Sequence, residues 1–379
     1  MSGIIPAVGP IVIHGAGSIG AYVGLAWQLA GADIRLLGRP WLAEAALAAD
    51  HLELSDYAAH GGRIASADVR ITTDPTVLAQ AALVVLGIKA TALDAAIAEL
   101  KAHCPPATPI LSLQNGIGPL ERLRAALPDH TILGGVVTHN VVVIDRHRFH
   151  KATAGNIVVE ASPLLAPLEA VAQNRFAPVA FAEDFEAVRW GKLLINLNNA
   201  VNAVSGLGLR TQFLDPRWRA MTAAAIREGM KVAKAENIRP AKTGAVSPQR
   251  LALALSLPQW LLQRLPLLAR IDARARSSMA DDVAAGKPTE IAFLNGAICT
   301  LGRKHGVATP INDWLVSQVT AFTKEAPPRL LISKVLVTAL ILFPFFFLPL
   351  YFFSLLCVFV VDIFLNLLLF LFCLKTRSY

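Results

Sequence analysis

The chain has 379 residues, of which 54% are hydrophobic and 16% charged, and its formal net charge is +8. This length exceeds one ordinary domain, so we expect two domains and an appendage. The lysines and arginines are dispersed and form no basic block, which argues against a nucleic-acid-binding protein. The surplus positive charge favours small anions such as phosphates and carboxylates.

The cysteines lack the paired spacing of a metal site or of a disulfide framework; they are Cys104, Cys299, Cys357 and Cys373. We therefore expect no metal site and a reducing, cytoplasmic environment. The first ten residues, MSGIIPAVGP, lack the basic region and the long apolar core of a signal peptide. The lack of signal-peptide features in these residues also favours the cytoplasm.

The stretch at residues 11–20, IVIHGAGSIG, places an apolar run before a GxGxxG pattern, and a helix-like segment begins at Ser18. In a strand–turn–helix of this kind, Gly15 permits the sharp turn, Gly17 lets the backbone approach a pyrophosphate, and Gly20 lets the helix pack on its strand. The free amides at the start of the helix would face the phosphates. The pattern therefore predicts dinucleotide binding, with a tight turn that binds nothing as the alternative. The residues predicted to hold the cofactor here are Gly15, Ala16, Gly17, Ser18, Ile19 and Gly20.

The second strand indicates which nicotinamide cofactor is bound. We predict a helix at residues 18–29 and a strand at residues 33–37. A fold that prefers NAD carries an acidic residue at the far end of this strand, where it binds the ribose hydroxyl. Here that place holds Arg39, and Asp33 lies at the opposite end. Because a guanidinium matches a phosphate, Arg39 predicts NADPH; an ordinary exposed arginine is the alternative.

The alternation of strands and helices continues after this point. We predict strands at residues 69–72, 83–88 and 110–113, and a helix at residues 91–101. These strands are apolar throughout, which is typical of buried parallel strands. Lys89 and Asn115 follow two of them, at the edge of the sheet where ligands bind. A solvated lysine and an Asn-Gly turn are the structural alternatives. Short β-like runs follow at residues 132–160, and we assign no chemistry to their histidines.

The pattern then changes to helices, beginning with RWGKLLINLNNAVNAVSGL. On a single helix Lys192, Asn196 and Asn199 share one face. The residues of an apolar face are Leu194, Leu197, Val201 and Val204. Packing does not require a polar strip on such an apolar helix, because unpaired amides in a core are costly. The strip therefore indicates a binding function, and a solvated face is the alternative.

Five ordered motifs are similar to those of a known family: GAGSIG, GIKA, LQNGIG, WGKLLINLNNAVN and SSMADDVAAGKPTEIAFLNG. On these motifs the chain resembles the ketopantoate reductase (2-dehydropantoate 2-reductase) family over roughly residues 10–325. The resemblance implies an N-terminal α/β Rossmann domain at residues 1–182 and an all-helical C-terminal domain at residues 183–326. It places the active site in the cleft between them. A hydrophobic tail, residues 327–379, lies beyond the resemblance.

The resemblance implies that Lys192 is the general acid and that Lys89 and Asn115 contact the nicotinamide side of the cofactor or the keto acid. The chemistry agrees with this role for the lysine. Hydride transfer to a ketone carbon leaves charge on the oxygen, which an ammonium can stabilise and then protonate. A lysine in a closed cleft also loses solvation, which lowers its pKa toward the working range.

The resemblance further implies that Asn196 and Ser278 hold the substrate, with Asn199 as a neighbouring contact. Glu290 lies twelve residues after Ser278 and corresponds to the catalytic glutamate of the family, which also contacts the cofactor. Structural alternatives exist for two of these residues. Ser278 could be a helix cap, and Glu290 could be a favourable charge at the start of a helix predicted at residues 290–304.

One position departs from the family pattern. The family usually carries a second asparagine eight residues after the lysine, where this chain has Ala200. A different partner for a substrate hydroxyl can change selectivity strongly. The resemblance implies reduction of 2-dehydropantoate to (R)-pantoate with NADPH, on the path to pantothenate and coenzyme A. The alternatives are a reductase of another branched 2-keto acid and a non-catalytic, membrane-tethered NADP-binding sensor. The expected partner is the small 2-keto acid, and a homodimer is left open.

The tail contains an apolar block at residues 331–374, and Asp362 is the one charged residue from 335 to 374. A membrane span needs about 20 apolar residues, so the block could form one or two transmembrane helices. Pro344 and Pro349 favour a hairpin with both positively flanked ends in the cytoplasm. Asp362 would be costly in lipid. We predict membrane contact through this block; the alternative is a segment foreign to the enzyme, either an unusual extension or a product of a shifted reading frame.

Overall fold

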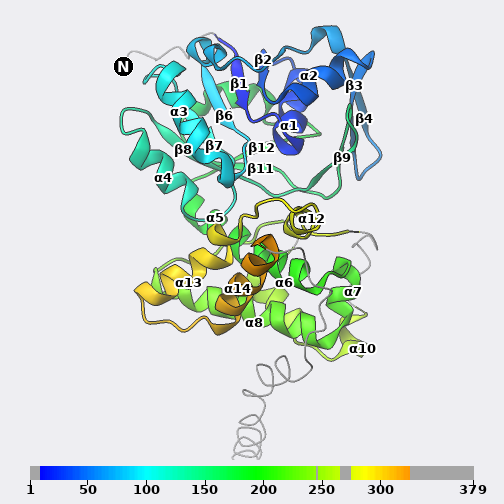
Figure 1. Cartoon of the computed structure of the whole chain (residues 1–379), viewed down its shortest axis with the longest axis vertical. Coiled ribbons are helices and arrows are strands. Elements are labelled where there is room, and N and C mark those ends of the chain that lie inside the picture. The colour runs from blue at the N-terminus through cyan, green and yellow to red at the C-terminus, as the bar shows by residue number, and fades with distance from the viewer. Residues whose placement is uncertain (1–8, 245, 265–274, 325–379) are drawn as a thin grey trace, which may run out of the picture. The chain divides into compact units, whose positions relative to one another are not determined.

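A computed structural model describes residues 9–244, 246–264 and 275–324. The strands of the described chain lie between Ile11 and Ala182, where they alternate with helices, and helices follow, so an N-terminal α/β domain is followed by a helical domain (Figure 1). The membrane contact predicted at residues 331–374 lies outside the described residues. None of the helices in the described part is both long enough and apolar enough to cross a bilayer.

The α/β domain is built on an eight-stranded sheet with the order β12-β11-β8-β7-β6-β1-β2-β5. Its strands are β1 (Ile11–His14), β2 (Ile34–Leu37), β5 (Ile71–Thr72), β6 (Leu83–Leu86), β7 (Ile110–Ser112), β8 (Ile132–Val137), β11 (Ile157–Glu160) and β12 (Val179–Ala182). The six strands from β8 to β5 are parallel, and β11 is antiparallel to β8. The predicted strands are confirmed, each one or two residues shorter than expected.

Helices cover both faces of this sheet (Figure 1). They are α1 (Ser18–Leu29), α2 (Pro40–Leu47), α3 (Leu93–His103) and α4 (Pro119–Ala126), with 3-10 helices η1 (Ser66–Asp68), η2 (Pro75–Gln80), η3 (Ala90–Ala92) and η4 (Pro163–Val171). Because side chains alternate along a strand, Ile13 of β1 packs in the cluster that contains α1, whereas Val12 packs with α3 on the other face. The predicted helix at 18–29 is confirmed, and the one predicted at 91–101 begins as η3 and continues as α3.

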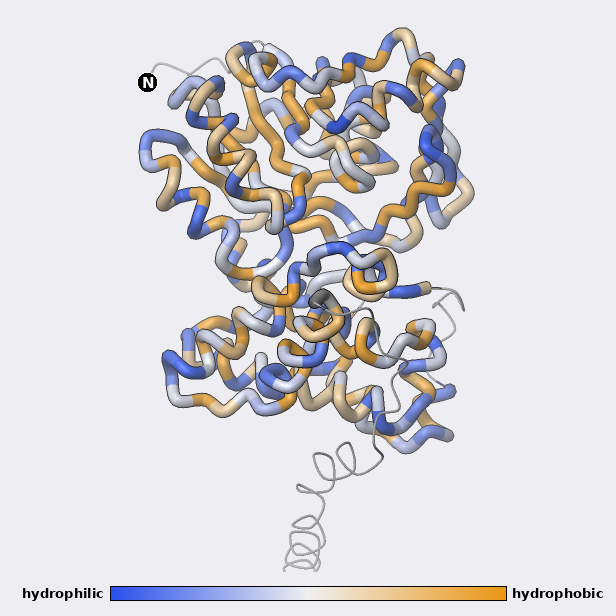
Figure 2. Tube along the Cα trace, in the orientation of Figure 1, coloured by the Kyte–Doolittle hydropathy of each residue, from blue (hydrophilic) through white to orange (hydrophobic). Residues whose placement is uncertain are grey.

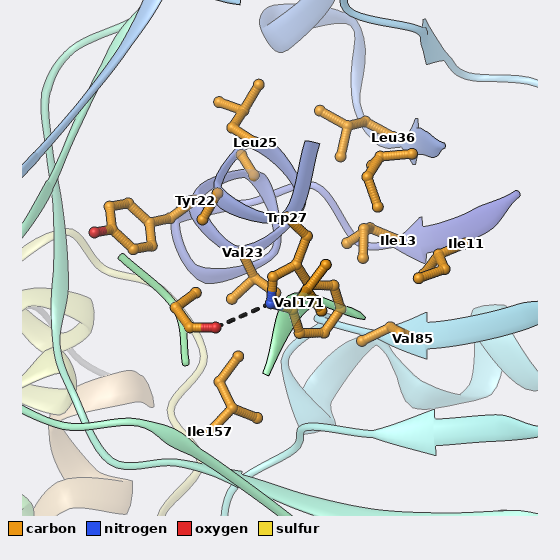
Figure 3. Packing of buried hydrophobic residues seen from close by; sticks show 14 of the residues in the cluster. Ile11, Ile13, Tyr22, Val23, Leu25, Trp27, Leu36, Val85, Ile157 and Val171 are labelled. Atoms are coloured by element: carbon orange, nitrogen blue, oxygen red, sulfur yellow. Dashed lines mark hydrogen bonds between the residues drawn. The ribbon is translucent and has the colours of Figure 1, made fainter. Parts of the chain in front are cut away.

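Trp27 anchors α1 to the centre of the domain. Its ring is fully buried among side chains of α1 and of the sheet, including Ile13 and Val85 (Figure 3). Its indole Nε1 donates a hydrogen bond of 3.0 Å to the carbonyl oxygen of Ala177. A buried indole with a satisfied N–H is a strong anchor. The position of α1, and with it the glycine turn before it, is therefore fixed by the core.

A second sheet has four strands in the order β4 (Gly61–Ala65), β3 (His51–Asp56), β10 (Arg148–Lys151) and β9 (Val141–Asp145). The β-like runs of residues 132–160 include β9 and β10, but β3 and β4 were not predicted. In β3 buried and more exposed residues alternate, and Leu52 and Leu54 pack with α1 and Phe149. Figure 2 shows hydrophobic residues along the central strands and hydrophilic ones mainly along loops and outer helices.

Most of the other helices of the helical domain pack around α8. The elements of this domain are α5 (Phe185–Asn196), α6 (Asn198–Ser205), α7 (Leu209–Leu214), α8 (Pro216–Ala235), α9 (Pro248–Ala254), α10 (Gln259–Leu262), α12 (Ser278–Ala284), η5 (Ile291–Phe293), α13 (Asn295–Lys304) and α14 (Pro310–Lys324). Glu228 of α8 accepts hydrogen bonds from the backbone N–H groups of Ile311 and Asn312, at 2.9 and 3.0 Å, and so fixes the start of α14. This carboxylate takes the place of a side-chain cap on α14.

Two helix predictions are wrong in detail. The polar strip was expected on one helix, but Leu197 separates α5 from α6. The helix expected at 290–304 is preceded by η5 and begins only at Asn295. Neither break coincides with a proline or with a glycine, and those are the residues that usually signal a break in a sequence.

Candidate active site

The glycine turn has the geometry that a bound pyrophosphate requires. Gly15 has a φ of +99°, and a Cβ atom there would lie 2.3 Å from Ile88 Cγ2. A Cβ on Gly20 would lie 2.2 Å from the carbonyl oxygen of Gly15, so the helix approaches the turn closely. A Cβ on Gly17 would meet no atom within 4 Å. The turn is thus closed toward the sheet and open on the other side of Gly17.

The first amides of α1 follow Gly17 directly. Gly17 is the N-cap of α1 and supplies no side-chain cap, and the N–H groups of Ser18 and Ile19 have no hydrogen-bond partner in the described part of the chain. The start of a helix with free amides attracts anions. A phosphate placed there would receive these hydrogen bonds, so the residues present fit a dinucleotide.

Arg39 lies next to the same turn. The backbone N–H groups of Gly15 and Ala16 both donate to the carbonyl oxygen of Leu37, the last residue of β2, at 2.9 and 3.1 Å. A Cβ on Gly38 would lie 2.9 Å from the Cβ of Ala16. The chain therefore carries Arg39 directly past the turn, where its exposed side chain makes no ion pair with the described residues. Its guanidinium is available to an anion.

Lys192 is on α5 and only partly accessible to solvent. Desolvation lowers the pKa of its amine from the usual 10.5 to about 8. The amine makes no hydrogen bond or ion pair with the described residues, so no carboxylate offsets this effect. An ammonium held without a counter-ion is suited to stabilise negative charge that forms on a ligand.

Three predicted site residues from distant parts of the chain form a hydrogen-bonded series. Asn196 Nδ2 donates to Asn115 Oδ1 at 3.5 Å, and Asn115 Nδ2 donates to Glu290 Oε2 at the same distance. The second oxygen of Glu290 accepts the backbone N–H of Ala90 at 2.9 Å. Burial raises the pKa of Glu290, and these hydrogen bonds oppose the shift. The series joins the ends of β6 and β7 to α5 and η5.

Lys89 has a partner that the sequence analysis did not single out. Its Nζ lies 2.5 and 2.6 Å from the two carboxylate oxygens of Asp282 on α12. Asp282 follows Ser278 by four residues on the same helix face, and that spacing could have indicated it. The ion pair places the start of α12 beside the carboxyl ends of the parallel strands.

Ser278 is not the residue that caps α12, and Glu290 makes contacts beyond the start of its helix. The side chain that caps α12 belongs to Ser277, whose Oγ accepts the N–H of Ala280 at 3.1 Å, while Ser278 is exposed. Glu290 makes no side-chain cap hydrogen bond to the helix that follows it. Its carboxylate instead accepts hydrogen bonds from Ala90 and Asn115 of the α/β domain.

The polar strip is divided between two helices, with Lys192 and Asn196 on α5 and Asn199 on α6. Asn199 is partly exposed, and its side-chain amide has no partner among the described residues. Asn198 is buried, and its Oδ1 accepts hydrogen bonds from other side chains. Ala200 is fully buried, so it faces the core. Ala200 stands where the family usually has its second asparagine, and the free amide of this segment belongs to the preceding residue, Asn199.

His139 is a further buried residue near this site, and the sequence pattern gave it no role. Its side chain is 2% exposed, and neither ring nitrogen has a hydrogen-bond partner in the described part of the chain. Burial together with the positive charges of Lys151 and Lys192 lowers the pKa of His139 to about 3. The imidazole is therefore neutral and adds no charge near Lys192.

The fold and the site together define a two-domain reductase that uses a nicotinamide dinucleotide. Family models described as "Ketopantoate reductase PanE/ApbA" and "Ketopantoate reductase PanE/ApbA C terminal" match residues 11–163 and 184–323. The chain belongs to the ketopantoate reductase family.

Individual proteins support this membership over most of the chain. The 2-dehydropantoate 2-reductase of Halobacterium salinarum is 27% identical over 317 residues, which cover 79% of this chain and 94% of that protein. The crystal structure of a PanE/ApbA family ketopantoate reductase from Ralstonia eutropha JMP134 is 26% identical and has a TM-score of 0.69, with coverage of 83% and 98%. A dimeric ketopantoate reductase from Staphylococcus aureus, 20% identical, shares the fold with a TM-score of 0.64 and coverage of 83% and 99%.

Proposed function

We propose that this protein reduces 2-dehydropantoate to (R)-pantoate with NADPH. The observation that carries the proposal is the uncompensated amine of Lys192, one helical turn before Asn196 of the series Asn196–Asn115–Glu290. The two domains of the chain both match the ketopantoate reductase family. The α/β domain is assigned to residues 1–182 and the helical domain to residues 183–326. The site uses residues from both.

The α/β domain would hold the cofactor. The turn from Gly15 to Gly20 and the free amides of α1 would bind the pyrophosphate, and Arg39 would bind the 2′-phosphate. Lys89, Asn115 and Glu290 would lie on the nicotinamide side. When bound, NADPH supplies a hydride to the carbonyl carbon of the substrate.

Lys192 would act as the general acid. Its ammonium stabilises the negative charge that develops on the carbonyl oxygen, then donates a proton from Nζ to form the hydroxyl group. The amine is left neutral and regains its proton from solvent. A pKa of about 8 suits both steps, because the amine is mainly charged near neutral pH and still gives up its proton readily.

The helical domain would orient the keto acid. Asn196, Asn199 and Ser278 offer amide and hydroxyl groups that can hydrogen-bond a carboxylate and a hydroxyl. Ala200 is buried and cannot take the role of the usual second asparagine. This difference favours a second candidate, the reduction of another branched 2-keto acid, by the same mechanism.

The deciding experiment follows NADPH oxidation at the nicotinamide absorbance band with purified protein and a panel of branched 2-keto acids that includes 2-dehydropantoate. We expect 2-dehydropantoate to have the highest kcat/KM of the acids in the panel. A higher value for another acid supports the second candidate. Binding of NADPH without turnover of any acid contradicts both and supports an NADP-binding sensor.

The predicted membrane contact of residues 331–374 has its own test. The full chain should bind to lipid vesicles, and a chain that ends at Ala326 should stay in solution with the same kcat/KM. Equal distribution of the two proteins between vesicles and solution would contradict membrane contact.

A further inference from the structure

Five buried polar residues of the helical domain form a hydrogen-bonded group, here called the amide cluster, that adjoins the proposed substrate residues Asn199 and Ser278 in the chain. They are Asn198, Asn202, Gln212, Thr222 and Ser277. The side chains of Asn202, Gln212 and Thr222 are fully buried, and the other two are nearly so. Buried amides are tolerated in a core when their hydrogen bonds are made, so such a cluster allows few alternative arrangements.

Gln212 of α7 is at the centre of the amide cluster. Its Oε1 accepts a hydrogen bond of 2.9 Å from Asn202 Nδ2. Its Nε2 donates to Asn198 Oδ1 at 2.7 Å and to Thr222 Oγ1 at 3.1 Å. Both N–H groups and the carbonyl oxygen are therefore used. Gln212 holds two residues that are four positions apart on α6, and these define one face of that helix.

This attachment sets the rotation of α6 about its axis. Successive residues of a helix point about 100° apart, so fixing Asn198 and Asn202 toward α7 fixes the direction of Asn199 as well. Asn199 is the residue of this segment whose amide is partly exposed and free of partners among the described residues. A different rotation of α6 would turn this amide away from the site.

The amide cluster also fixes the start of α12. Asn202 Oδ1 accepts the backbone N–H of Ser277 at 2.8 Å, and Ser277 Oγ donates to the carbonyl oxygen of Asn199 at 3.1 Å. Ser278 and Asp282 follow on α12, and Asp282 binds Lys89 of the α/β domain. One set of buried hydrogen bonds therefore orients two of the three segments that carry proposed substrate contacts, α6 with Asn199 and α12 with Ser278.

We infer that Gln212 is a positioning residue for the 2-keto acid, which it affects through the orientation of Asn199 on α6 and of Ser278 on α12. This inference rests on the proposed function. In the proposed mechanism Gln212 contacts neither the substrate nor the cofactor. Because the cofactor side of the site is built mainly by the α/β domain, loss of the amide cluster should weaken keto acid binding selectively.

The test compares Gln212→Met with the unaltered protein. Methionine is similar in length and cannot make the three hydrogen bonds. We expect the KM for the 2-keto acid to rise about tenfold, with kcat changed about threefold or less and the Kd for NADPH unchanged. An unchanged KM in the folded variant, or an equal change in the Kd for NADPH, would overturn the inference.

A matched control separates positioning from a general loss of stability. Asn174 also makes three side-chain hydrogen bonds, with Ala26, Phe176 and Ala177, but it lies in the α/β domain. Asn174→Ala should lower Tm and leave the KM for the keto acid unchanged. If it raises that KM as much as Gln212→Met does, the effect is one of stability and the inference fails.

If Gln212→Met does not fold, a milder variant tests whether the amide cluster positions the keto acid. Thr222→Val removes one bond to Gln212 and one to Asn198 and keeps the shape of the side chain. It should raise the KM about threefold, and an unchanged KM overturns the inference. If the unaltered protein turns over no keto acid, calorimetric binding of pantoate in the presence of NADP⁺ provides the same comparison. Absence of turnover contradicts the proposed function alone, and absence of pantoate binding contradicts both.

Discussion

Lys89 and Asp282 form an ion pair between residues that are 193 positions apart in the sequence, with the ammonium 2.5 and 2.6 Å from the two carboxylate oxygens. The pair connects the end of β6 to α12, next to the hydrogen bond between Ala90 and Glu290. The two domains are therefore joined by charged and polar contacts at the site itself. Changes to these contacts should affect catalysis as well as stability.

Replacing Asp282 by Asn should weaken this connection in a salt-dependent way. The side chain of Lys89 is 50% exposed, so solvent screens the pair, and we expect a loss of about 0.5 to 1 kcal/mol in the free energy of unfolding. Denaturant unfolding at low and at high salt measures it. The difference from the unaltered protein should shrink at high salt. An equal difference at both concentrations would show that the pair acts through packing and not through charge.

Lys192→Ala should abolish most of the turnover. A positioned general acid contributes about 100-fold to 10,000-fold, so we expect kcat to fall at least 100-fold while the Kd for NADPH changes little. Steady-state kinetics and fluorescence titration with NADPH measure the two quantities. Lys231→Ala, at an exposed position of α8, should leave both unchanged. An undiminished kcat in Lys192→Ala would remove the lysine from the mechanism.

The pH profile of reduction should show the titration of Lys192. Only the ammonium form can donate a proton, so kcat/KM should be constant below the pKa of about 8 and fall about tenfold per pH unit above it. A profile that stays flat up to pH 10 would contradict the assignment.

The same pKa predicts a stability difference with a defined sign. The folded lysine, with a pKa of about 8 against the usual 10.5, holds its proton less tightly than the unfolded lysine does. Between these pH values the unfolded state binds more protons, so the lysine's contribution to stability rises with pH. The free energy of unfolding, compared with that of Lys192→Met, should increase from pH 8 to pH 10.5. A decrease over this range would be inconsistent with a buried, unpaired amine.

The parts of the site that could be predicted from sequence are those with a local signature. The glycine turn was predicted because glycine at residues 15, 17 and 20 has a specific backbone role between a strand and a helix. Lys192 and Asn196 were predicted to share a helix face and both lie on α5, whereas Asn199, expected on the same helix, lies on α6. Their roles at the site stay predictions until variants are measured.

The contacts that could not be predicted depend on tertiary folding. Nothing near residue 282 in the sequence indicates Lys89 as its partner, and nothing near Gln212 indicates a bond to Asn198. Ser277 and Ser278 are neighbours of the same type, and only the path of the backbone decides which one caps α12. The strands β3 and β4 were missed because short alternating runs such as HLELSD give a weak signal.

Arg39→Ala should reduce the preference for NADPH over NADH. Loss of a guanidinium–phosphate contact should raise the KM for NADPH about tenfold and leave the KM for NADH unchanged. Arg70→Ala is the matched control, because the guanidinium of Arg70 binds Asp33 at the opposite end of β2. Steady-state kinetics with both cofactors decide the question. An unaltered ratio of the two KM values would exclude Arg39 from cofactor selection.

A substitution at Gly116 tests the contact between η5 and the loop that follows β7. Gly116 has a φ of +88°, and a Cβ atom there would lie 2.1 Å from the carbonyl oxygen of Phe293. The next residue, Ile117, donates its N–H to the same oxygen at 3.0 Å. Alanine at residue 116 must therefore strain the backbone and also push η5 away from the loop.

Gly31 provides the control for backbone strain alone, because its φ is +93° and a Cβ atom there would meet nothing within 4 Å. Gly31→Ala should cost about 1 to 2 kcal/mol and leave the KM for the keto acid unchanged. Gly116→Ala should cost more and also raise this KM, because moving the loop displaces Asn115 from Glu290 and Asn196. Denaturant unfolding and steady-state kinetics on both variants test this. If the two variants lose the same stability and keep the same KM, the contact with Phe293 does not position the site.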